Sequence, residues 1–391
     1  MKRALRILYA AGPGDVVNTY RNWKQKLDDP SQVSVTYSGQ FYDLCQDLNA
    51  HGYALSFHLA TEVLNDGPMT IENRAKRPHN ASGILYHFAE IWYGLRLVVT
   101  AIRFRADVAV VAEGTTYWFI LLLLSLFRIK LIPSLHCVLW PKYKPPARRQ
   151  RFINRLNKCL FQKHCFALLS ASEDITTQIQ QITGGQHSQV VHFLPTYRRE
   201  TFSDIGDPAA TRDHFRVLFA GRIERNKGVF DLLEIAKRFQ AEGRTEIEFA
   251  ICGTGSALEE LRREAAKAGV AESFHCYGHR SRQEMKEELR MSHVLIVPTT
   301  TDFIEGFNQV VVEGVLAGRP VITSSICPAL SYVRGAVVEV APDDVQGYGD
   351  AIIRLQEDRK LYEQKRLACM SYQAQFYDLE QSWAAALKSV L

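Results

Sequence analysis

Two carboxylates, Glu305 and Glu313, stand eight positions apart in a stretch whose local signals are mixed. In a helix, eight positions make about two turns, so one carboxylate would lie at the start of the helix and the other on its flank. Gly306 and Asn308 are poor residues for a helix interior, whereas the valines at 310–312 favour a strand. If the helix forms, the two acids give one elongated polar ligand two anchor points.

Two cations, Arg222 and Lys227, share a loop that follows an apolar run at 217–220. A guanidinium can hold a phosphate through two hydrogen bonds, and an ammonium adds a compact point charge. Such bonds contribute roughly 1.5–3 kcal/mol each, and they strengthen as negative charge builds on a departing diphosphate. An Arg and a Lys in a loop are more often simply solvated, so their spacing alone leaves both interpretations open.

The stretch 305–322 resembles the signature of the family 4 retaining glycosyltransferases, which is close to EGFGLVxxEAMAxGxPVI. Residues 221–228 are similar to the family's GR, a few residues, KG motif, and residues 253–255 to its third glycine turn. The sequence departs from the signature at Asn308, where Gly is common, and at Gly314, where Ala is common. Both positions lie near the family's sugar subsite, so the departures bear on the identity of the donor sugar.

The resemblance implies the GT-B fold, an α/β architecture with two doubly wound Rossmann-like domains that face a central cleft. It implies that Glu305 contacts the donor sugar, that Glu313 holds the ribose hydroxyls, and that the amides between them face the donor phosphates. It also implies that Arg222 and Lys227 stabilise the leaving diphosphate. The family commonly has a His at the end of a strand in the first domain, where His136 stands, although a lone His is more often structural.

We therefore predict a site with three sets of residues. The catalytic set is Arg222, Lys227, Glu305 and His136. The donor-binding set is Gly12, Gly14, Gly221, Gly253, Gly255, Thr300, Gly306, Phe307, Asn308 and Glu313. The set expected at the acceptor is Asp15, Arg21 and Glu113. The sequence has no Asp-x-Asp metal motif, so we expect neither a metal nor another cofactor besides the nucleotide-sugar co-substrate.

The elements that would position these residues follow from alternating apolar and helix-compatible runs. An apolar run at 7–11 leads through a glycine turn at 12–15 into a helix, and strand ends and helix starts of this kind collect anionic ligands. Strands alternating with helices predict parallel sheets that are covered on both faces. The further strands predicted in the first half are 33–37, 53–59, 108–112, 131–135, 166–170 and 190–193. Those of the second half are 217–220, 247–251, 274–277, 294–297 and 321–323.

The domain boundary is predicted from the polar, breaker-rich segment 195–212. We assign 1–199 to an acceptor-side Rossmann-like domain, 200–213 to a linker, 214–372 to a nucleotide-sugar donor-binding domain, and 373–391 to a final helix. In this last segment Phe376, Leu379, Trp383 and Leu387 follow helical spacing, which predicts one amphipathic helix. In the resembled fold such a helix crosses back onto the first domain.

Composition is typical of a soluble globular protein, with 47% hydrophobic and 23% charged residues. A chain of 391 residues is expected to form two or three domains. The eight cysteines show no CxxC pair and no metal-ligand spacing, which favours reduced core residues in a cytoplasmic protein. No signal peptide precedes the first strand, and the apolar run 118–127 is shorter than a bilayer span, so a buried helix is expected there.

Residues 140–164 are rich in Lys and Arg and contain no acidic residue. On a helical projection one stripe holds Arg148, Arg151, Arg155 and Lys158, and the neighbouring face holds Phe152, Leu156, Cys159 and Leu160. One interpretation is a surface helix whose apolar face joins the core. The other is a basic stripe, flanked by Trp140 and Tyr143, that lies on an anionic membrane and brings a lipid-linked acceptor to the site.

From the resemblance we expect a hexosyltransferase that moves a sugar from a nucleotide diphosphate sugar to an acceptor hydroxyl with retention of configuration. UDP and GDP are the expected nucleotides, and the expected acceptor is a small molecule, a lipid-linked sugar or a polysaccharide precursor. Nucleic acid is not an expected partner, and the expected location is cytoplasmic or peripheral on the cytoplasmic face of a membrane. A nucleotide-sugar epimerase or phosphorylase on the same fold, and a noncatalytic nucleotide-sugar binding protein, stay open as alternatives.

Overall fold

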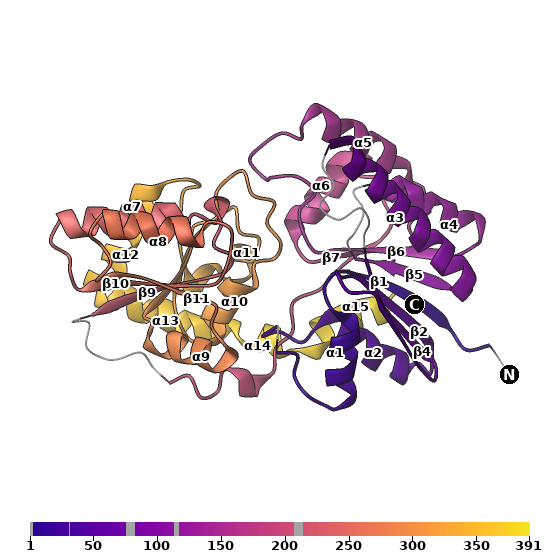
Figure 1. Ribbon diagram of the computed structural model, residues 1–391, viewed down its shortest axis with the longest axis horizontal. Helices are drawn as coiled ribbons and strands as arrows, with labels where there is room; N and C mark the ends of the chain where they lie inside the picture. The colour runs from indigo at the N-terminus through magenta and orange to yellow at the C-terminus, as the bar shows by residue number, and fades with distance from the viewer. Residues whose placement is uncertain (1–2, 31, 76–82, 113–116, 207–213) are drawn as a thin grey trace. The chain divides into compact units, whose positions relative to one another are not determined.

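The computed structural model describes residues 3–30, 32–75, 83–112, 117–206 and 214–391 (Figure 1). The chain divides into two compact units. Unit 1 comprises Met1–Leu139, Pro146–Thr196 and Leu379–Leu391, and unit 2 comprises Trp140–Pro145 and Tyr197–Asp378. Each unit has a mainly parallel sheet with helices on its two faces, so the predicted pair of Rossmann-like domains is confirmed.

The described part of unit 1 holds an eight-stranded sheet with its first strand near the middle. The strands are β1 (Arg6–Pro13), β2 (His51–Phe57), β3 (Glu62–Asp66), β4 (Met69–Arg74), β5 (Val108–Val111), β6 (Lys130–Leu135), β7 (Leu168–Ser170) and β8 (Val190–His192). Their order is β3-β4-β2-β1-β5-β6-β7-β8, and β3 pairs antiparallel to β4 whereas the other pairs are parallel. After β1 the chain forms β2, β3 and β4 on one side of that strand and then β5 to β8 on its other side. The strand order therefore reverses between β1 and β5.

One strand predicted for this half was wrong, and one hairpin was not predicted. Residues 33–37 do not form a strand, because the Thr36 side chain accepts a hydrogen bond from the Gly39 amide at 3.0 Å and so starts helix α2 (Tyr37–Asp47). The hairpin β3–β4 was not predicted, since its strands are rich in polar residues. In β4 the buried side chains of Glu72 and Arg74 form an ion pair at 2.6 Å, which offsets the cost of burying both charges.

Helices cover both faces of the unit 1 sheet (Figure 1). One face carries α3 (Gly83–Phe104), η1 (Trp118–Leu122), α4 (Leu123–Leu126), α5 (Arg148–Cys159), η2 (Leu160–His164) and α6 (Glu173–Thr183). The other carries α1 (Val16–Lys24), α2 and α15 (Trp383–Lys388). The run 118–127, expected as one buried helix, is split into η1 and α4 and exposes Leu126 and Phe127. No helix in the described ranges is long and apolar enough to cross a bilayer.

Unit 2 has a six-stranded, fully parallel sheet among its described residues. The strands are β9 (Phe215–Ala220), β10 (Ile247–Cys252), β11 (Phe274–Gly278), β12 (Val294–Val297), β13 (Val321–Ser324) and β14 (Val337–Val340), in the order β11-β10-β9-β12-β13-β14. The helices are η3 (Arg199–Thr201), η4 (Arg225–Lys227), α7 (Val229–Ala241), α8 (Leu258–Lys267), α9 (Arg282–Met291), α10 (Gln309–Leu316), α11 (Leu330–Val333), η5 (Arg334–Ala336), α12 (Val345–Glu357), α13 (Arg359–Tyr372) and α14 (Ala374–Tyr377). The strand order reverses at β9, whose neighbours are β10 and β12; β14 was not among the predicted strands.

The carboxy-terminal tail differs from the single amphipathic helix expected at 373–391. It forms α14, η6 (Leu379–Gln381) and α15, because Asp378 has an extended backbone and the Ser382 hydroxyl caps a new helix. Within unit 1, Trp383 is fully buried, lies 4.9 Å from the ring of Tyr9, and donates from its indole to the Ser134 hydroxyl at 2.9 Å. The chain after Asp378 is thus part of the first domain, whereas Trp140–Pro145, expected there, groups with the second.

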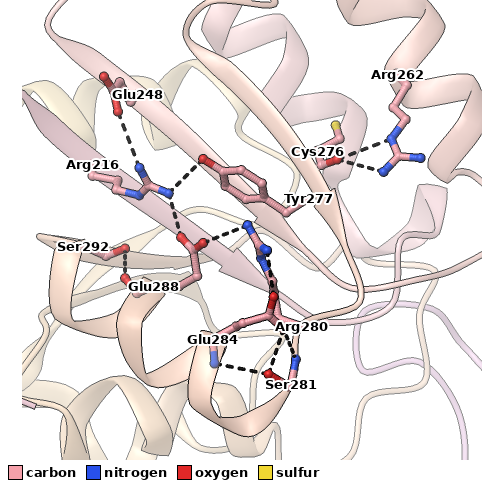
Figure 2. Close-up of polar contacts among 10 residues, drawn as sticks. All are labelled: Arg216, Glu248, Arg262, Cys276, Tyr277, Arg280, Ser281, Glu284, Glu288 and Ser292. Carbon is pink, nitrogen blue, oxygen red and sulfur yellow. Dashed lines mark hydrogen bonds and ion pairs between the residues drawn. The ribbon is translucent and has the colours of Figure 1, made fainter.

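A buried charge cluster holds α9 against the sheet of unit 2 (Figure 2). Arg216 in β9 donates to Glu288 in α9 at 2.6 Å and to the Tyr277 hydroxyl in β11 at 3.1 Å. Arg280 adds an ion pair to Glu288 at 3.3 Å, and its guanidinium lies 4.3 Å from the centre of the Tyr277 ring. Glu288 is 4% exposed and pairs with both guanidinium groups, each of which also has a more exposed carboxylate partner: Glu248 for Arg216 at 3.7 Å and Glu284 for Arg280 at 3.2 Å.

Replacement of Glu288 by alanine is expected to lower the free energy of unfolding by about 3–5 kcal/mol, since it leaves two charges without their buried partner. Urea unfolding monitored by circular dichroism measures this difference. The matched control is Glu287→Ala on the same helix, where an exposed pair with Arg290 is removed and little change is expected. Equal losses in the two variants would contradict a structural role of the buried cluster.

Candidate functional site

The candidate site lies at the carboxyl edge of the unit 2 sheet, where strand order reverses between β9 and β12. In doubly wound sheets, ligands bind outside the carboxyl ends of the strands at such a reversal. The loops there are 221–228 after β9, 253–257 after β10 and 298–308 after β12. The residues predicted from the three motifs lie on these loops and on α10, so the topology brings them to one edge of one sheet.

Glycines allow these loops to pack directly on one another. A Cβ atom added at Gly253, whose φ is +137°, would lie 1.8 Å from the carbonyl oxygen of Gly221. One added at Gly228, with φ +74°, would lie 2.0 Å from the Pro298 oxygen, and one at Gly255 would lie 2.2 Å from the Ile223 oxygen. The glycines predicted to border the donor therefore also serve close backbone contact within the site.

Replacement of Gly253 by alanine is expected to lower the free energy of unfolding by at least about 3 kcal/mol, because backbone atoms of another loop occupy the space of the new methyl group. Gly243→Ala is the matched control, since φ there is +74° but no atom lies within 4 Å of an added Cβ. Its expected cost is about 1 kcal/mol, from backbone strain alone. Urea unfolding compares the two; a loss at Gly253 no larger than the control would mean that the loops separate easily.

Glu305 is the most constrained acid of the site. Its Oε2 atom is 2.8 Å from Lys227 Nζ and accepts hydrogen bonds from Thr299 Oγ1 and Asn308 Nδ2, each at 3.0 Å. The Gly306 amide donates to Oε1 at 3.1 Å. Since Glu305 is 6% exposed, these donors compensate most of the cost of its burial. Lys227 and Glu305, 78 positions apart in the chain, thus form an ion pair before any ligand binds.

Arg222 and Lys227 converge on one aromatic ring, that of Phe303. Lys227 Nζ lies 3.8 Å from the ring centroid and the Arg222 guanidinium carbon 5.5 Å. Arg222 also pairs with Glu224 at 3.3 Å, but 61% of its side chain is exposed. One cation is therefore held within the site while the other lies at its surface, both in reach of a common ligand.

Glu313 occupies the second turn of α10 and differs from Glu305 in lacking donors. Burial raises its pKa from the ordinary value of 4.5 to about 7. Within the described part of the chain, the carboxyl group has no hydrogen bond or ion pair. A partly buried acid without donors is suited to accept hydrogen bonds from hydroxyl groups of a ligand.

Other residues predicted for the donor site have structural contacts of their own. Thr300 donates from both its amide and its hydroxyl to the Asn226 carbonyl, each at 3.1 Å, and so ties the β12 loop to the β9 loop. Phe307 is buried with its ring 5.2 Å from that of Tyr332. Asn308 has φ +64°, a left-handed conformation that Asn tolerates better than most side chains, which explains why it can stand where Gly is common.

Gly314 was expected near the sugar subsite, but it faces the sheet. An added Cβ would lie 3.0 Å from side-chain atoms of both Leu295 in β12 and Val321 in β13. The absence of a methyl group thus follows from close packing of α10 on the strands. This departure from the signature is thus explained by packing within unit 2.

The first-half residues of the donor set lie in unit 1 at the carboxyl end of β1, with Gly12 inside the strand and Gly14 directly after it. Gly12, Gly14 and Asp15 line a cavity of about 210 Å³. Asp15 Oδ1 accepts from the Asn18 amide at 2.9 Å and from Asn73 Nδ2 at 2.6 Å. Partial burial tends to raise the pKa of Asp15, but these two hydrogen bonds lower it below its usual value. The ionised Asp15 side chain therefore caps the start of α1.

The structure does not bring Arg21, the next predicted acceptor residue, to this cavity. Arg21 forms an exposed ion pair with Glu62 and does not line it. Glu113 lies outside the described residues. Tyr37, which sequence analysis placed in a strand and did not single out, lines the cavity and makes the contact with His136 described next.

His136 lies between aromatic rings in unit 1, with its ring centroid 4.6 Å from that of Tyr37 and 5.2 Å from that of Phe193. Desolvation lowers the pKa of His136 to about 4, so the ring is neutral near pH 7. Its Nε2 atom is 3.0 Å from Ser134 Oγ, which already accepts from the Trp383 indole. This chain of contacts favours a proton on Nδ1 and leaves that atom as the hydrogen-bond donor.

Two residues of the unit 2 site were not singled out in the sequence, Phe303 and Thr299. Phe303 lies in the middle of the β12 loop, and its contact with both cations depends on how that loop folds over the β9 loop. Thr299 is 2% exposed and completes the shell around Glu305. The only signal for either residue was position between a predicted strand and the first Glu of the motif.

Comparison with known proteins finds a family model that matches most of the second unit. Residues 204–370 match the family model described as "Glycosyl transferases group 1". A 2-deoxystreptamine N-acetyl-D-glucosaminyltransferase of Niallia circulans is 27% identical over 153 residues, which are 39% of this chain and 38% of that protein. A glycogen synthase of Mycobacterium tuberculosis is 29% identical over 146 residues, 36% of this chain and 34% of that protein. The chain thus spans little more than a third of the length of these relatives.

Solved structures resemble the chain over nearly its whole length. Sucrose-phosphate synthase from Thermosynechococcus elongatus matches with a TM-score of 0.70 and 14% identity, covering 98% of this chain and 97% of that one. HepE from Anabaena, solved in complex with UDP and glucose, matches with a TM-score of 0.68 and 16% identity, covering 98% and 100%. The predicted GT-B fold class is confirmed, whereas membership of family 4 and the central cleft stay predictions. The segment 204–370, which holds the Lys227–Glu305 pair at the reversal of strand order, matches the model of the group 1 glycosyl transferases.

Proposed function

We propose that the protein transfers a hexose from a nucleotide diphosphate sugar to an acceptor hydroxyl with retention of configuration, as a member of family 4. The observation that carries this proposal is the arrangement of Lys227, Glu305 and Arg222 at the strand reversal of unit 2. Glu313 lies nearby in the chain, in the second turn of α10. Two cations and two acids at one sheet edge match the charges of a nucleotide sugar, which has a diphosphate between two groups rich in hydroxyls.

In the proposed reaction the bond between the anomeric carbon and the phosphate oxygen breaks while the acceptor oxygen bonds to the same face of that carbon. The acceptor proton passes to an oxygen of the departing diphosphate, so no protein carboxylate becomes covalently attached. Lys227 and Arg222 stabilise the charge that develops on the diphosphate. Glu305 exchanges part of its hydrogen bonding with Lys227 for a sugar hydroxyl, and Glu313 accepts from the ribose hydroxyls.

We further propose UDP or GDP as the nucleotide, no requirement for a metal ion, and action at the cytoplasmic side on a small-molecule, polysaccharide-precursor or lipid-linked acceptor. Arg222 and Lys227 carry the role that a divalent cation has at other diphosphate sites. The UDP complex of HepE, which shares the fold, supports a test of UDP first.

A thermal-shift panel of UDP, GDP, ADP, TDP and CMP, each with and without EDTA, tests the donor half of the proposal. A ligand at about 100 times its dissociation constant adds about 2.7 kcal/mol to the folded state, which raises the Tm by a few degrees. We expect UDP or GDP to stabilise the protein equally with EDTA present. No response to any nucleotide would contradict the proposal, and an inverted anomer in the product by NMR would contradict its stereochemistry.

A further inference from the structure

Roughly half of the large apolar side chains that lie exposed in the described chain gather on one helical layer of unit 1. The layer consists of α3, η1, α4 and α5, which lie together on one side of the eight-stranded sheet (Figure 1). Its most exposed members are 61–74% accessible: Ile84, Leu85, Phe88, Trp92, Leu126 and Phe152. We call this surface the apolar face. Monomeric soluble proteins rarely leave a large apolar patch exposed unless that patch binds something.

Helix α3 has two apolar stripes where a surface helix needs one. Ala89, Tyr93 and Leu97 are buried against the unit, as expected of the stripe that joins the core. Phe88 and Trp92, one turn apart, point to the other side and remain mostly exposed. The second stripe adds nothing to the core of this unit, so its apolar character requires another explanation.

Helix α5 presents a similar side to solvent. Ile153, Asn154 and Asn157 are its buried residues, whereas Phe152 and Leu156 are 64% and 38% exposed. Of the two interpretations weighed for the basic segment, an apolar face that joins the core is therefore wrong for these two side chains. They lie instead on the same exposed surface as the arginines of α5.

The segment η1 joins α3 and α5 into one surface. Tyr117, Ile120 and Ile153 form a small core between them, with Ile91 of α3 packed against it. The Phe119 amide donates to Asn157 Oδ1 of α5 at 3.0 Å. The exposed stripes of the two helices are thus parts of a common layer rather than separate patches.

The layer is basic as well as apolar. Across 83–105, 117–130 and 146–165 the only carboxylate is Glu90, which is 2% exposed. The exposed cations of α5 alone are Arg148, Arg149, Arg151, Arg155 and Lys158. An apolar surface bordered by cations without exposed acids is complementary to an anionic bilayer, in which rings enter the interface and cations meet head groups.

A second copy of the chain fits this surface poorly. A two-fold dimer through the apolar face would set the arginines of α5 against those of the partner, since such an interface joins the same patch of both subunits. Like charges brought together in an interface oppose binding. The absence of exposed acids on the described part of the layer leaves nothing to compensate them, so charge complementarity selects a lipid surface.

Chain topology places the apolar face beside the predicted acceptor edge. Helix α3 connects β4 to β5, and α5 follows β6, so both helices begin at the carboxyl edge of the unit 1 sheet. The carboxyl end of β1, with Gly14 and Asp15 directly after it, and His136 directly after β6 lie at this same edge. An acceptor held in the bilayer beside the starts of α3 and α5 would thus be close to the residues expected to receive it.

We propose that the apolar face docks unit 1 on an anionic lipid bilayer and that the acceptor is anchored in that bilayer by a lipid. The docking stands on the geometry of α3, η1–α4 and α5, whereas the identity of the acceptor rests on the proposed glycosyl transfer.

Flotation with phosphatidylcholine vesicles, with and without phosphatidylglycerol, tests the docking. Wild type is expected to partition at least about tenfold more strongly onto the anionic vesicles. Phe88→Ser with Trp92→Ser, and separately Arg151→Glu with Arg155→Glu, are each expected to lower this partition about tenfold or more. The matched control is Leu367→Ser with Met370→Ser on α13, two side chains exposed to a similar degree, which should leave partition unchanged.

Wild type that stays with neither vesicle, or that binds both equally, would overturn the docking. The docking would also be overturned if light scattering showed that the wild type is a dimer and that the Phe88→Ser, Trp92→Ser double variant is a monomer. The nucleotide thermal shift, measured on the same samples, keeps the two proposals apart. A response to UDP or GDP without vesicle binding would refute the docking alone, and vesicle binding without any nucleotide response would refute the proposed function alone.

Discussion

Replacing Lys227 by methionine is expected to lower kcat by a factor of about 10²–10³, the usual effect of removing one group that stabilises developing charge. Lys227 is the cation held inside the site, 2.8 Å from Glu305, whereas the Arg222 side chain is 61% exposed at the surface of the site. Initial rates of donor hydrolysis or sugar transfer measure the loss. Arg225→Met is the matched control on the same short helix, since Arg225 pairs with Glu260 at the surface and its loss should leave the rate nearly unchanged.

A double variant separates the catalytic role of Lys227 from its structural one. Lys227→Met alone leaves the buried Glu305 charge with its other donors only, and should lower the free energy of unfolding by about 1–3 kcal/mol. Adding Glu305→Gln removes the unpaired charge and should restore most of that stability while the rate stays low. Recovery of turnover together with stability would show that the pair only holds the loops in place.

The donor-site residues of unit 2 could be predicted because they lie in short continuous sequence motifs. The segments 221–228 and 305–313 each carry both an unusual backbone requirement and a charged side chain, and each follows a clear apolar strand. These two motifs do not show that they contact each other in the folded protein. Lys227 meets Glu305 because β9 and β12 are neighbours at the strand reversal, which only the strand order of the sheet provides.

The first unit was harder to predict because its elements break the usual patterns for physical reasons. The strand β4 carries Glu72 and Arg74, which are tolerated there only because they neutralise each other. The run 33–37 looks like a strand, but Thr36 is a helix cap and its hydrogen bond decides the outcome. The apolar face of α3 resembles a core stripe in sequence, since periodicity gives the direction of a side chain around the helix but does not say what lies opposite it.

Replacing Glu313 by glutamine is expected to stabilise the protein without ligand above neutral pH and to weaken nucleotide binding. Burial raises the pKa of Glu313 from 4.5 to about 7, so between these values the folded state keeps a proton that the unfolded chain has released. The stability of the wild type therefore falls as pH rises through this window and stays lower above it. The difference is at most about 3 kcal/mol, and glutamine, which cannot ionise, avoids it.

Urea unfolding at pH 5 and pH 8 measures this effect. The two proteins should be of similar stability at pH 5, and Glu313→Gln should be the more stable at pH 8. Glu259→Gln on the surface of α8 is the control and should show no such pH-dependent difference. A Glu313→Gln protein less stable than wild type at pH 8 would mean that the carboxylate already has favourable partners in the absence of ligand.

The Glu313→Gln variant also tests whether Glu313 belongs to the donor site. If Glu313 accepts hydrogen bonds from ribose hydroxyls, the ligand supplies the partners that the free protein lacks, and the charged form becomes favourable. Bonds to a charged acceptor contribute roughly 1.5–3 kcal/mol, so the loss of charge should weaken nucleotide binding by about tenfold or more at pH 8. The nucleotide thermal shift would then shrink in the more stable protein. If the nucleotide raised the Tm of Glu313→Gln as much as that of the wild type, Glu313 would not be a donor-binding residue. The stability and the nucleotide binding would then depend on different groups.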